Sequence, residues 1–262
     1  MNIKIFYFSG TGNSLYVAKE IKKYLKDSEI IPIAKCMLEE EFNFDFKKIG
    51  FVFPVYYMGL PKIVEDFVKS AKFRHAEYIF ALATRGSSLS GGTLKMLNKC
   101  LEEKSRSLNY GRYITFFSNF IPEFKIPPEE KQLKIIADNE EIIYKYAHEI
   151  YNETKSISGN FSDFFAEKYH KKYIKDIKNS FMYFHVDKKL CNNCGLCEQI
   201  CPTNSIILDD LKNPLWKNNC TLCLSCLHHC PKNAIDYKHM TKNKERYSNP
   251  KISPKELIDQ KK

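Results

Sequence analysis

Hydrophobic residues in the first 155 positions alternate between short apolar runs and stretches where they recur every three or four residues. The runs predict buried β-strands, and the periodic stretches predict amphipathic helices. The predicted strands span residues 3–8, 30–34, 50–55, 78–84 and 113–117, and the predicted helices span residues 12–26, 62–71, 94–103 and 129–154. Strands that alternate with helices predict an α/β fold, a doubly wound parallel five-stranded sheet covered on both faces.

The pattern changes after residue 155. Residues 156–185 contain Gly159, several serines and then an aromatic, basic stretch with helical spacing, which predicts a helical connector between two domains. Residues 186–240 are rich in cysteine and poor in helical signal, and residues 241–262 form a lysine-rich tail with two prolines. We expect this tail to be extended and partly disordered. The predicted parts of the chain are therefore 1–155, 156–185, 186–240 and 241–262.

Composition and charge exclude several classes of protein. The chain is 44% hydrophobic and carries a formal net charge of +10, but its lysines are scattered and mixed with acids. Such a surface favours solvation or an acidic protein partner over nucleic acid. No apolar run is long enough for a membrane span, and the N-terminus enters a strand pattern directly, without a signal peptide. We expect a cytoplasmic protein.

Eight of the ten cysteines fall into two runs with the spacing CxxCxxCxxxCP. This is the bacterial spacing for two [4Fe–4S] clusters, in which the fourth cysteine of each run binds the other cluster. The predicted ligand sets are Cys191, Cys194, Cys197 and Cys230 for cluster one, and Cys220, Cys223, Cys226 and Cys201 for cluster two. Paired zinc sites are the alternative, but zinc motifs use separated CxxC pairs. Over about fifty residues the segment resembles the bacterial two-cluster ferredoxins.

Three loops at the carboxyl ends of predicted strands carry the other candidate site. The loop FSGTGNS joins the first strand to a helix, and its small, hydroxyl-rich residues suit an anion held by neutral donors. Neither GxxxxGK[ST] nor GxGxxG is present. A TGN loop at this position resembles the flavodoxins, which implies FMN as cofactor. The candidate FMN-binding residues are Ser9, Gly10, Thr11, Gly12, Asn13 and Ser14; Pro54, Val55, Tyr56, Tyr57, Met58 and Gly59; and Thr84, Arg85, Gly86, Ser87, Ser90, Gly91 and Gly92.

The whole chain resembles the flavodoxin–ferredoxin fusion proteins of anaerobic bacteria and archaea. The resemblance extends to Trp216 before the second cysteine run and to Arg246-Tyr247-x-Asn249-Pro250 in the tail. It implies a flavodoxin-like domain, a connector and an α+β two-cluster ferredoxin domain. We expect Trp216 to pack over a cluster or under the connector, His228 and His229 to lie on the surface beside Cys230, and Arg85 to favour an anionic flavin.

Three functions stay open at this point. The first is an electron-transfer protein that couples the two-electron chemistry of FMN to one-electron clusters, with an acidic ferredoxin or a flavoenzyme as partner. The second is a flavin-dependent reductase with its own small substrate above Tyr56 and Tyr57. The third is a redox subunit that docks into a larger complex through the basic connector. No residue is identified as a catalytic acid, base or nucleophile.

Overall fold

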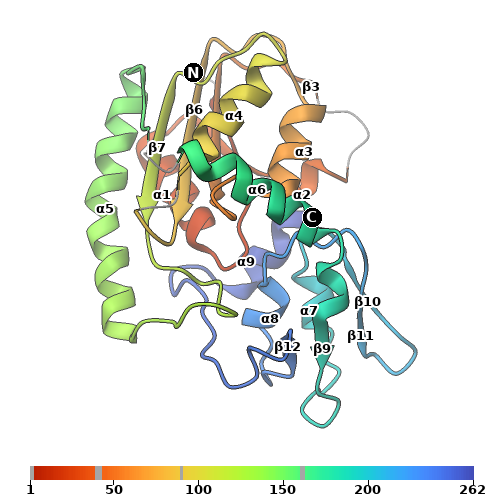
Figure 1. Ribbon diagram of the computed structural model, residues 1–262. Helices are drawn as coiled ribbons and strands as arrows, with labels where there is room; N and C mark the ends of the chain where they lie inside the picture. The colour runs from red at the N-terminus through yellow and green to blue at the C-terminus, as the bar shows by residue number, and fades with distance from the viewer. Residues whose placement is uncertain (1–2, 39–42, 89–90, 160–162) are drawn as a thin grey trace.

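A parallel sheet forms the centre of the N-terminal part of the chain (Figure 1). The computed structural model describes residues 3–38, 43–88, 91–159 and 163–262. Within these residues the sheet has six strands in the order β2-β1-β4-β6-β7-β8. The strands are β1 (Ile3–Tyr7), β2 (Ser28–Pro32), β4 (Lys48–Pro54), β6 (Tyr78–Arg85), β7 (Tyr110–Thr115) and β8 (Ser156–Ile157). All neighbouring strands are parallel.

Helices cover both faces of this sheet, as the apolar strands require. The side chains of α1 (Asn13–Tyr24) and α5 (Glu129–Tyr151) complete one core cluster. Those of α2 (Ile33–Cys36), α3 (Lys62–Ser70) and α4 (Thr93–Glu102) complete the other. Two short strands, β3 (Asn43–Phe44) and β5 (Lys72–Phe73), pair separately at one side. The doubly wound, flavodoxin-like α/β fold is thus confirmed.

The prediction of five strands is wrong by one. Strand β8 lies in the segment assigned to the connector, where the Ser156 N–H donates to the Asn109 carbonyl at 2.9 Å and the Ser158 N–H donates to Gly111 at 2.9 Å. Two residues are too few to display a period of two, so the hydrophobic pattern could not reveal this edge strand. The rest of the connector contains α6 (Asp163–Ile177) and the 3₁₀-helix η1 (Ser180–Tyr183).

The cysteine-rich segment is built from two similar halves. Strand β9 (Phe184–Val186) pairs antiparallel with β12 (Ile235–Tyr237), and β10 (Ile206–Leu208) pairs with β11 (Pro214–Trp216). The third cysteine of each run lies in a one-turn helix, α7 (Leu196–Gln199) or α8 (Ser225–His228). Residues with positive φ precede both helices, Gly195 at 73° and Leu224 at 58°. The repeat in the sequence therefore corresponds to a repeat in the backbone.

The C-terminal tail is folded, which corrects the expectation of an extended chain. It ends in α9 (Pro254–Ile258) and the 3₁₀-helix η2 (Asp259–Lys261). Ser253 and Glu256 form a reciprocal capping box, and Pro254 occupies the first helical position. The sequence Ser-Pro-Lys-Glu carries this start signal, which the lysine-rich composition outweighed in our prediction. In Figure 1 the violet tail lies between the sheet and the cysteine-rich segment.

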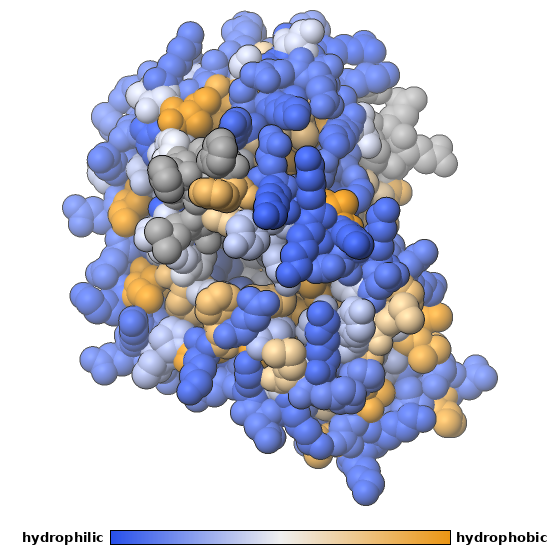
Figure 2. All heavy atoms as spheres, in the orientation of Figure 1, coloured by the Kyte–Doolittle hydropathy of each residue, from blue (hydrophilic) through white to orange (hydrophobic). Residues whose placement is uncertain are grey.

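The outer surface is dominated by polar side chains. Figure 2 shows hydrophilic residues over most of one face, with separate small apolar areas among them. No helix in the described part of the chain is both long and apolar enough to cross a membrane. The exposed side chains of α6 include four lysines, Lys168, Lys171, Lys172 and Lys175, together with Phe165 and Tyr169.

Candidate functional site

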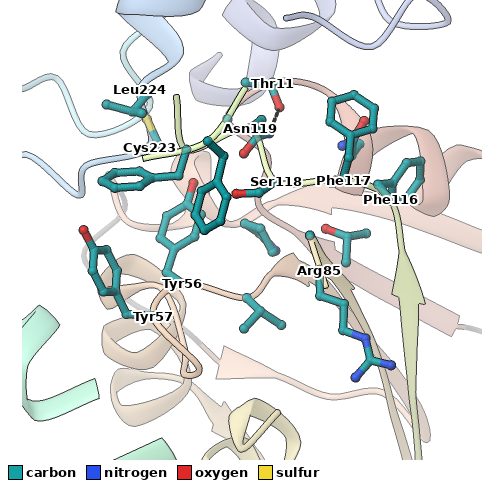
Figure 3. A pocket seen from close by; sticks show the side chains of 18 of the residues that line it. Thr11, Tyr56, Tyr57, Arg85, Phe116, Phe117, Ser118, Asn119, Cys223 and Leu224 are labelled. Atoms are coloured by element: carbon teal, nitrogen blue, oxygen red, sulfur yellow. Dashed lines mark hydrogen bonds between the residues drawn. The ribbon is translucent and has the colours of Figure 1, made fainter. Parts of the chain in front are cut away.

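The three predicted loops meet around one cavity of about 530 Å³ at the carboxyl edge of the sheet (Figure 3). It is polar on the side of the first loop and aromatic on the side of the second. The predicted residues that line it are Ser9, Gly10, Thr11, Asn13, Ser14, Pro54, Val55, Tyr56, Tyr57, Met58, Thr84, Arg85, Gly86 and Ser87. Cavities of this size and mixed lining are typical of cofactor sites.

The first loop presents free backbone donors to the cavity. The N–H groups of Gly10, Thr11, Asn13 and Ser14 make no hydrogen bond to any residue that the structure describes. Gly12, with φ of 101°, turns the chain into α1, so these donors lie at the N-terminal end of a 12-residue helix. Because the positive end of a helix dipole adds to the donors, the loop is suited to a phosphate group without a basic side chain.

The tail closes the first loop from outside. The Gln260 side chain accepts from the Ser9 N–H at 3.1 Å and donates to the Ser9 carbonyl at 3.0 Å. The Tyr247 hydroxyl donates to Asn13 Oδ1 at 2.6 Å, and the Asn249 amide donates to the same oxygen at 2.9 Å. The loop is therefore held by residues more than 230 positions away, a contact that local sequence patterns cannot show.

The second loop is a tight turn. The N–H groups of Tyr56 and Gly59 each donate to the carbonyl of the other at 3.0 and 2.8 Å, and Tyr57 and Met58 both have positive φ, 47° and 63°. Non-glycine residues with positive φ store backbone strain, and such strain is typical of functional sites. The turn presents both tyrosine rings to the cavity and is supported by α6, where Tyr173 stacks on Tyr57 at 5.3 Å.

Four predicted residues do not line the cavity: Gly12, Gly59, Gly91 and Gly92. Two of these glycines make room for α6 instead. A Cβ atom on Gly59 would lie 2.2 Å from His170 Nδ1, and one on Gly92 would lie 2.1 Å from the Ala166 Cβ. Ser90, from the same predicted loop, is outside the described residues.

Arg85 lies at the edge of the cavity, but its guanidinium points away from Tyr56 and Tyr57 (Figure 3). It lies 4.5 Å above the Tyr113 ring, and its Nε donates to Thr115 Oγ1 at 3.0 Å. Burial lowers the pKa of this side chain. An effect of Arg85 on the charge of a bound flavin stays a prediction without a supporting contact.

About half of the residues that line the cavity were not predicted from the sequence. Aromatic and polar residues after β7 form one side: Phe116, Phe117, Ser118, Asn119, Phe120, Glu123, Phe124 and Lys125. Tyr169 and Tyr173 of α6 form another, and Leu222, Cys223 and Leu224 of the second cysteine run complete it. The cluster of phenylalanines between strand and helix was the available signal for the first group. The other two groups come from outside the N-terminal domain.

The second cysteine run is packed directly on the first loop. A Cβ atom added at Gly10 would lie 2.7 Å from the Cys223 carbonyl oxygen and 3.3 Å from the Tyr56 hydroxyl. Only a glycine permits this approach. Burial, followed by the neighbouring Cys223, raises the pKa of Tyr56 well above its ordinary value. The phenol therefore stays neutral between the two loops.

The cysteines form two groups that mix the two runs. Cys191, Cys194, Cys197 and Cys230 line one small cavity of about 20 Å³. In the other group, burial raises the pKa of Cys220, Cys223 and Cys226, and the proximity of Cys201 raises all three further. Among the described residues, no three His, Cys, Asp or Glu side chains lie close enough to hold one metal ion.

Backbone N–H groups donate to two of the cysteine sulfurs. The Ser205 N–H donates to Cys201 Sγ at 3.2 Å, and the Ala234 N–H donates to Cys230 Sγ at 3.3 Å, at the same offset in each half. Trp216 stacks on Phe184, with ring centroids 5.2 Å apart, and its indole nitrogen is buried with no hydrogen-bond partner among the described residues. Phe184 belongs to the predicted connector, so the stacking agrees with one expected position of Trp216, and packing over a cluster stays a prediction. Hydrogen bonds of this kind stabilise thiolates and tune metal centres.

His228 and His229 are buried, so the prediction of a surface position is wrong. His228 Nδ1 accepts the Tyr247 N–H at 3.1 Å, and its Nε2 therefore donates to the Asn119 carbonyl at 2.9 Å. Burial lowers the pKa of His228 to about 3, which keeps the imidazole neutral. The imidazole ring therefore links α8 by hydrogen bonds to Asn119 in the cavity wall and to Tyr247 in the tail. An apolar environment and two backbone partners were not visible in the sequence.

Two protein families match this chain, one in its N-terminal part and one in its cysteine-rich part. Residues 4–109 match the family described as flavodoxin domain, and residues 190–235 match the family described as 4Fe-4S dicluster domain. No curated protein matches the chain in sequence.

Solved structures resemble the N-terminal part. A flavodoxin variant from Pseudomonas aeruginosa is 14% identical over 56% of this chain and 97% of its own, with a TM-score of 0.35. A protein described as a flavoprotein from Bacteroides uniformis is 19% identical over 52% and 97%, with a TM-score of 0.34. Rubredoxin oxygen:oxidoreductase from the anaerobe Desulfovibrio gigas is 13% identical over 58% of this chain and 36% of its own, with a TM-score of 0.33.

Proposed function

This chain is a flavodoxin–ferredoxin fusion, a flavodoxin domain followed by a 4Fe-4S dicluster domain, and from that premise we propose that it passes electrons between FMN and two [4Fe–4S] clusters. FMN takes up two electrons and each cluster takes up one, so the protein would couple two-electron to one-electron steps. The chain's own contribution is to bind and orient the cofactors and to exclude water.

The residues around the 530 Å³ cavity fit FMN. The free N–H groups of Gly10, Thr11, Asn13 and Ser14 would hold the phosphate at the start of α1. Tyr56 and Tyr57 would provide the aromatic surface for the isoalloxazine ring, and the loop from Thr84 to Ser87 would meet its polar edge. The neutral phosphate site distinguishes this cavity from that of a nucleotide hydrolase.

The two cysteine groups fit crossed cluster ligation. Cluster one would be held by Cys191, Cys194, Cys197 and Cys230, which line one cavity. Cluster two would be held by Cys220, Cys223, Cys226 and Cys201; Cys201 and Cys226 are buried in one core cluster, and Cys220 packs against it. The N–H groups directed at Cys201 and Cys230 support thiolate ligands in both sets.

One observation carries the proposal: Cys223, a predicted ligand of cluster two, lines the flavin cavity with its neighbours Leu222 and Leu224. The three atoms nearest to a Cβ at Gly10 are two atoms of Cys223 and the Tyr56 hydroxyl, so no other described segment separates the cysteine run from the first loop there. Cluster two would therefore be the cluster beside the flavin. The close contact favours direct transfer within the molecule.

Cluster one would be the electron port for an external partner. In the first set Cys194 is exposed and the other three cysteines are partly exposed, whereas in the second set two are partly exposed and Cys201 and Cys226 are buried. The Asn193 side chain donates to the Leu211 carbonyl at 2.9 Å, which brings the β10–β11 turn beside this cluster. Exposed apolar and basic side chains lie near this cluster: Leu190, Leu211, Leu215, Lys188, Lys189, Lys212 and Lys232. A basic rim with apolar contacts suits an acidic redox protein such as a ferredoxin.

The order of cofactors can be tested by removing cluster one. The Cys194→Ala variant should keep cluster two and FMN, and dithionite should still reduce its flavin. Reduction of the flavin by a reduced acidic two-cluster ferredoxin should slow at least tenfold in stopped-flow absorbance, whereas Cys100→Ser, a buried thiol outside both sets, should behave as wild type. Unchanged flavin reduction by the ferredoxin in Cys194→Ala would refute the proposed order.

A reductase is the second candidate, because the cavity is larger than the three flavodoxin loops alone define. Phe120, Glu123 and Phe124 extend its wall, and Phe124 is 48% exposed at the rim. Small quinones that reoxidise the reduced flavin, and lose this effect in Phe124→Ala, would favour the reductase. Equal reoxidation in both proteins would favour the electron carrier.

A further inference from the structure

Arg246 is a partly buried cation, and two of its guanidinium nitrogens are buried without a partner among the described residues. Its Nη2 donates to the Ile235 carbonyl at 3.0 Å, but its Nε and Nη1 atoms are buried and have no hydrogen-bond partner in the described part of the chain. No carboxylate there lies within 4.0 Å of the guanidinium. A buried, unpaired guanidinium is costly, so a negatively charged group is expected to face it.

The nearest carboxylate does not fill this role. Asp236 influences the pKa of Arg246, but its Oδ1 already accepts from both the backbone N–H and the hydroxyl of Thr241, at 2.8 and 2.6 Å. Its Oδ2 lies 3.8 Å from His239. A buried water would satisfy the two N–H groups of the arginine without balancing its charge.

The sulfur ligands lie on the remaining side. Arg246 is close enough to Cys230 and Cys226 for both to affect its pKa, after the larger effect of burial. Its anchor, Ile235, lines the cavity of cluster one, and the neighbouring Ala234 donates to Cys230 Sγ at 3.3 Å. The crossed ligand sets assign Cys230 to cluster one and Cys226 to cluster two.

We propose that Arg246 is the shared counter-charge of the two clusters, and that its Nε–H and Nη1–H groups donate to their sulfur atoms. The inference rests on the proposed cluster ligation. Each reduced cluster carries one more negative charge than its oxidised form, so a fixed cation beside both favours the reduced state of each. Arg246 would raise both reduction potentials and weaken the repulsion that opposes reduction of the second cluster after the first.

Redox titration followed by electron paramagnetic resonance tests this role. Arg246→Gln should shift the one-electron equilibrium of at least one cluster tenfold or more toward the oxidised form, about 59 mV for a single electron. Lys244→Gln is the matched control, because it removes the same charge two residues away, where the lysine Nζ binds the Ile121 and Pro122 carbonyls. The control should keep wild-type potentials.

The iron content of each protein shows whether a negative result concerns Arg246 or the proposed function. Wild-type potentials in Arg246→Gln with about eight irons per chain would overturn the inference and leave the proposed function intact. If Arg246→Gln does not retain its clusters, Arg246→Met decides, because it removes the charge and both donors while keeping an apolar side chain of similar length. Potentials lower than those of Lys244→Gln would then support the inference, and wild-type potentials would overturn it. Absence of iron from the wild-type protein would refute the proposed function itself.

Discussion

At the scale of single residues, the glycines separate what sequence could predict from what it could not. The loop around Gly10 and Gly12 was predicted from its small residues, and Gly12 has the positive φ of 101° that such a turn needs. Gly59 and Gly92 were predicted to meet the flavin, yet they admit His170 and Ala166 of α6. A glycine in the sequence indicates a close approach, but not the identity of the approaching group.

Gly10 gives a direct test at this scale. In Gly10→Ala the new methyl group would lie 2.7 Å from the Cys223 carbonyl oxygen, and backbone on both sides must shift to admit it. We expect FMN affinity to fall at least tenfold, measured by fluorescence titration of the deflavinated protein. Gly159→Ala is the control, because nothing lies within 4 Å of a Cβ atom there. Equal affinities in the two variants would contradict the contact between the loops.

At the scale of elements, long strands and helices followed from their hydrophobic periods, whereas short ones did not. Strand β8 has two residues, and the helix α9 has five. Their positions depend on contacts with Asn109 and Ser9, which are remote in sequence. The charged composition of residues 241–262 favoured disorder, but the capping box and the burial of Gln260 overrode it.

Removal of the last two helices tests the role of the tail. A chain that ends at residue 252 lacks Gln260, so the N–H and carbonyl of Ser9 lose their hydrogen-bond partners. The first loop, which would hold the FMN phosphate, is then open to water. We expect each concentration of added FMN to raise the thermal midpoint less than in the full chain, because the stabilisation by a bound ligand falls as its dissociation constant rises. Lys255→Gln, an exposed change on α9, should leave FMN retention unaltered. Full FMN retention by the truncated chain would contradict this role.

The connector helix supports both cofactor regions through Tyr173. Its hydroxyl donates to the Thr221 carbonyl at 3.2 Å beside cluster two, and its ring stacks on Tyr57. Tyr173→Phe leaves a buried carbonyl without this donor, which should lower the free energy of unfolding by about 1–3 kcal/mol. Tyr169→Phe, at a side chain 53% exposed, should change it by less than about 0.5 kcal/mol. Urea unfolding monitored by circular dichroism compares the two, and equal midpoints would argue against the bridging contact.

At the scale of the whole molecule, two sequence motifs were enough to predict the order of the domains. They did not predict which residues of the two domains are in contact. The CxxCxxCxxxCP runs and the TGN loop each indicated one cofactor. The structure adds that Cys223 and Gly10 are in contact, and that α6 and the tail enclose their junction. Contacts between distant segments depend on three-dimensional packing, which local spacing does not encode.

The most direct test is an anaerobic reductive titration of the purified chain, with iron, sulfide, zinc and FMN measured on the same sample. We expect about eight irons, about eight sulfides and one FMN per chain, with no zinc. We also expect uptake of about four electrons per chain, two by the flavin and one by each cluster. Zinc in place of iron, or an uptake of about two electrons with no flavin bound, would contradict it.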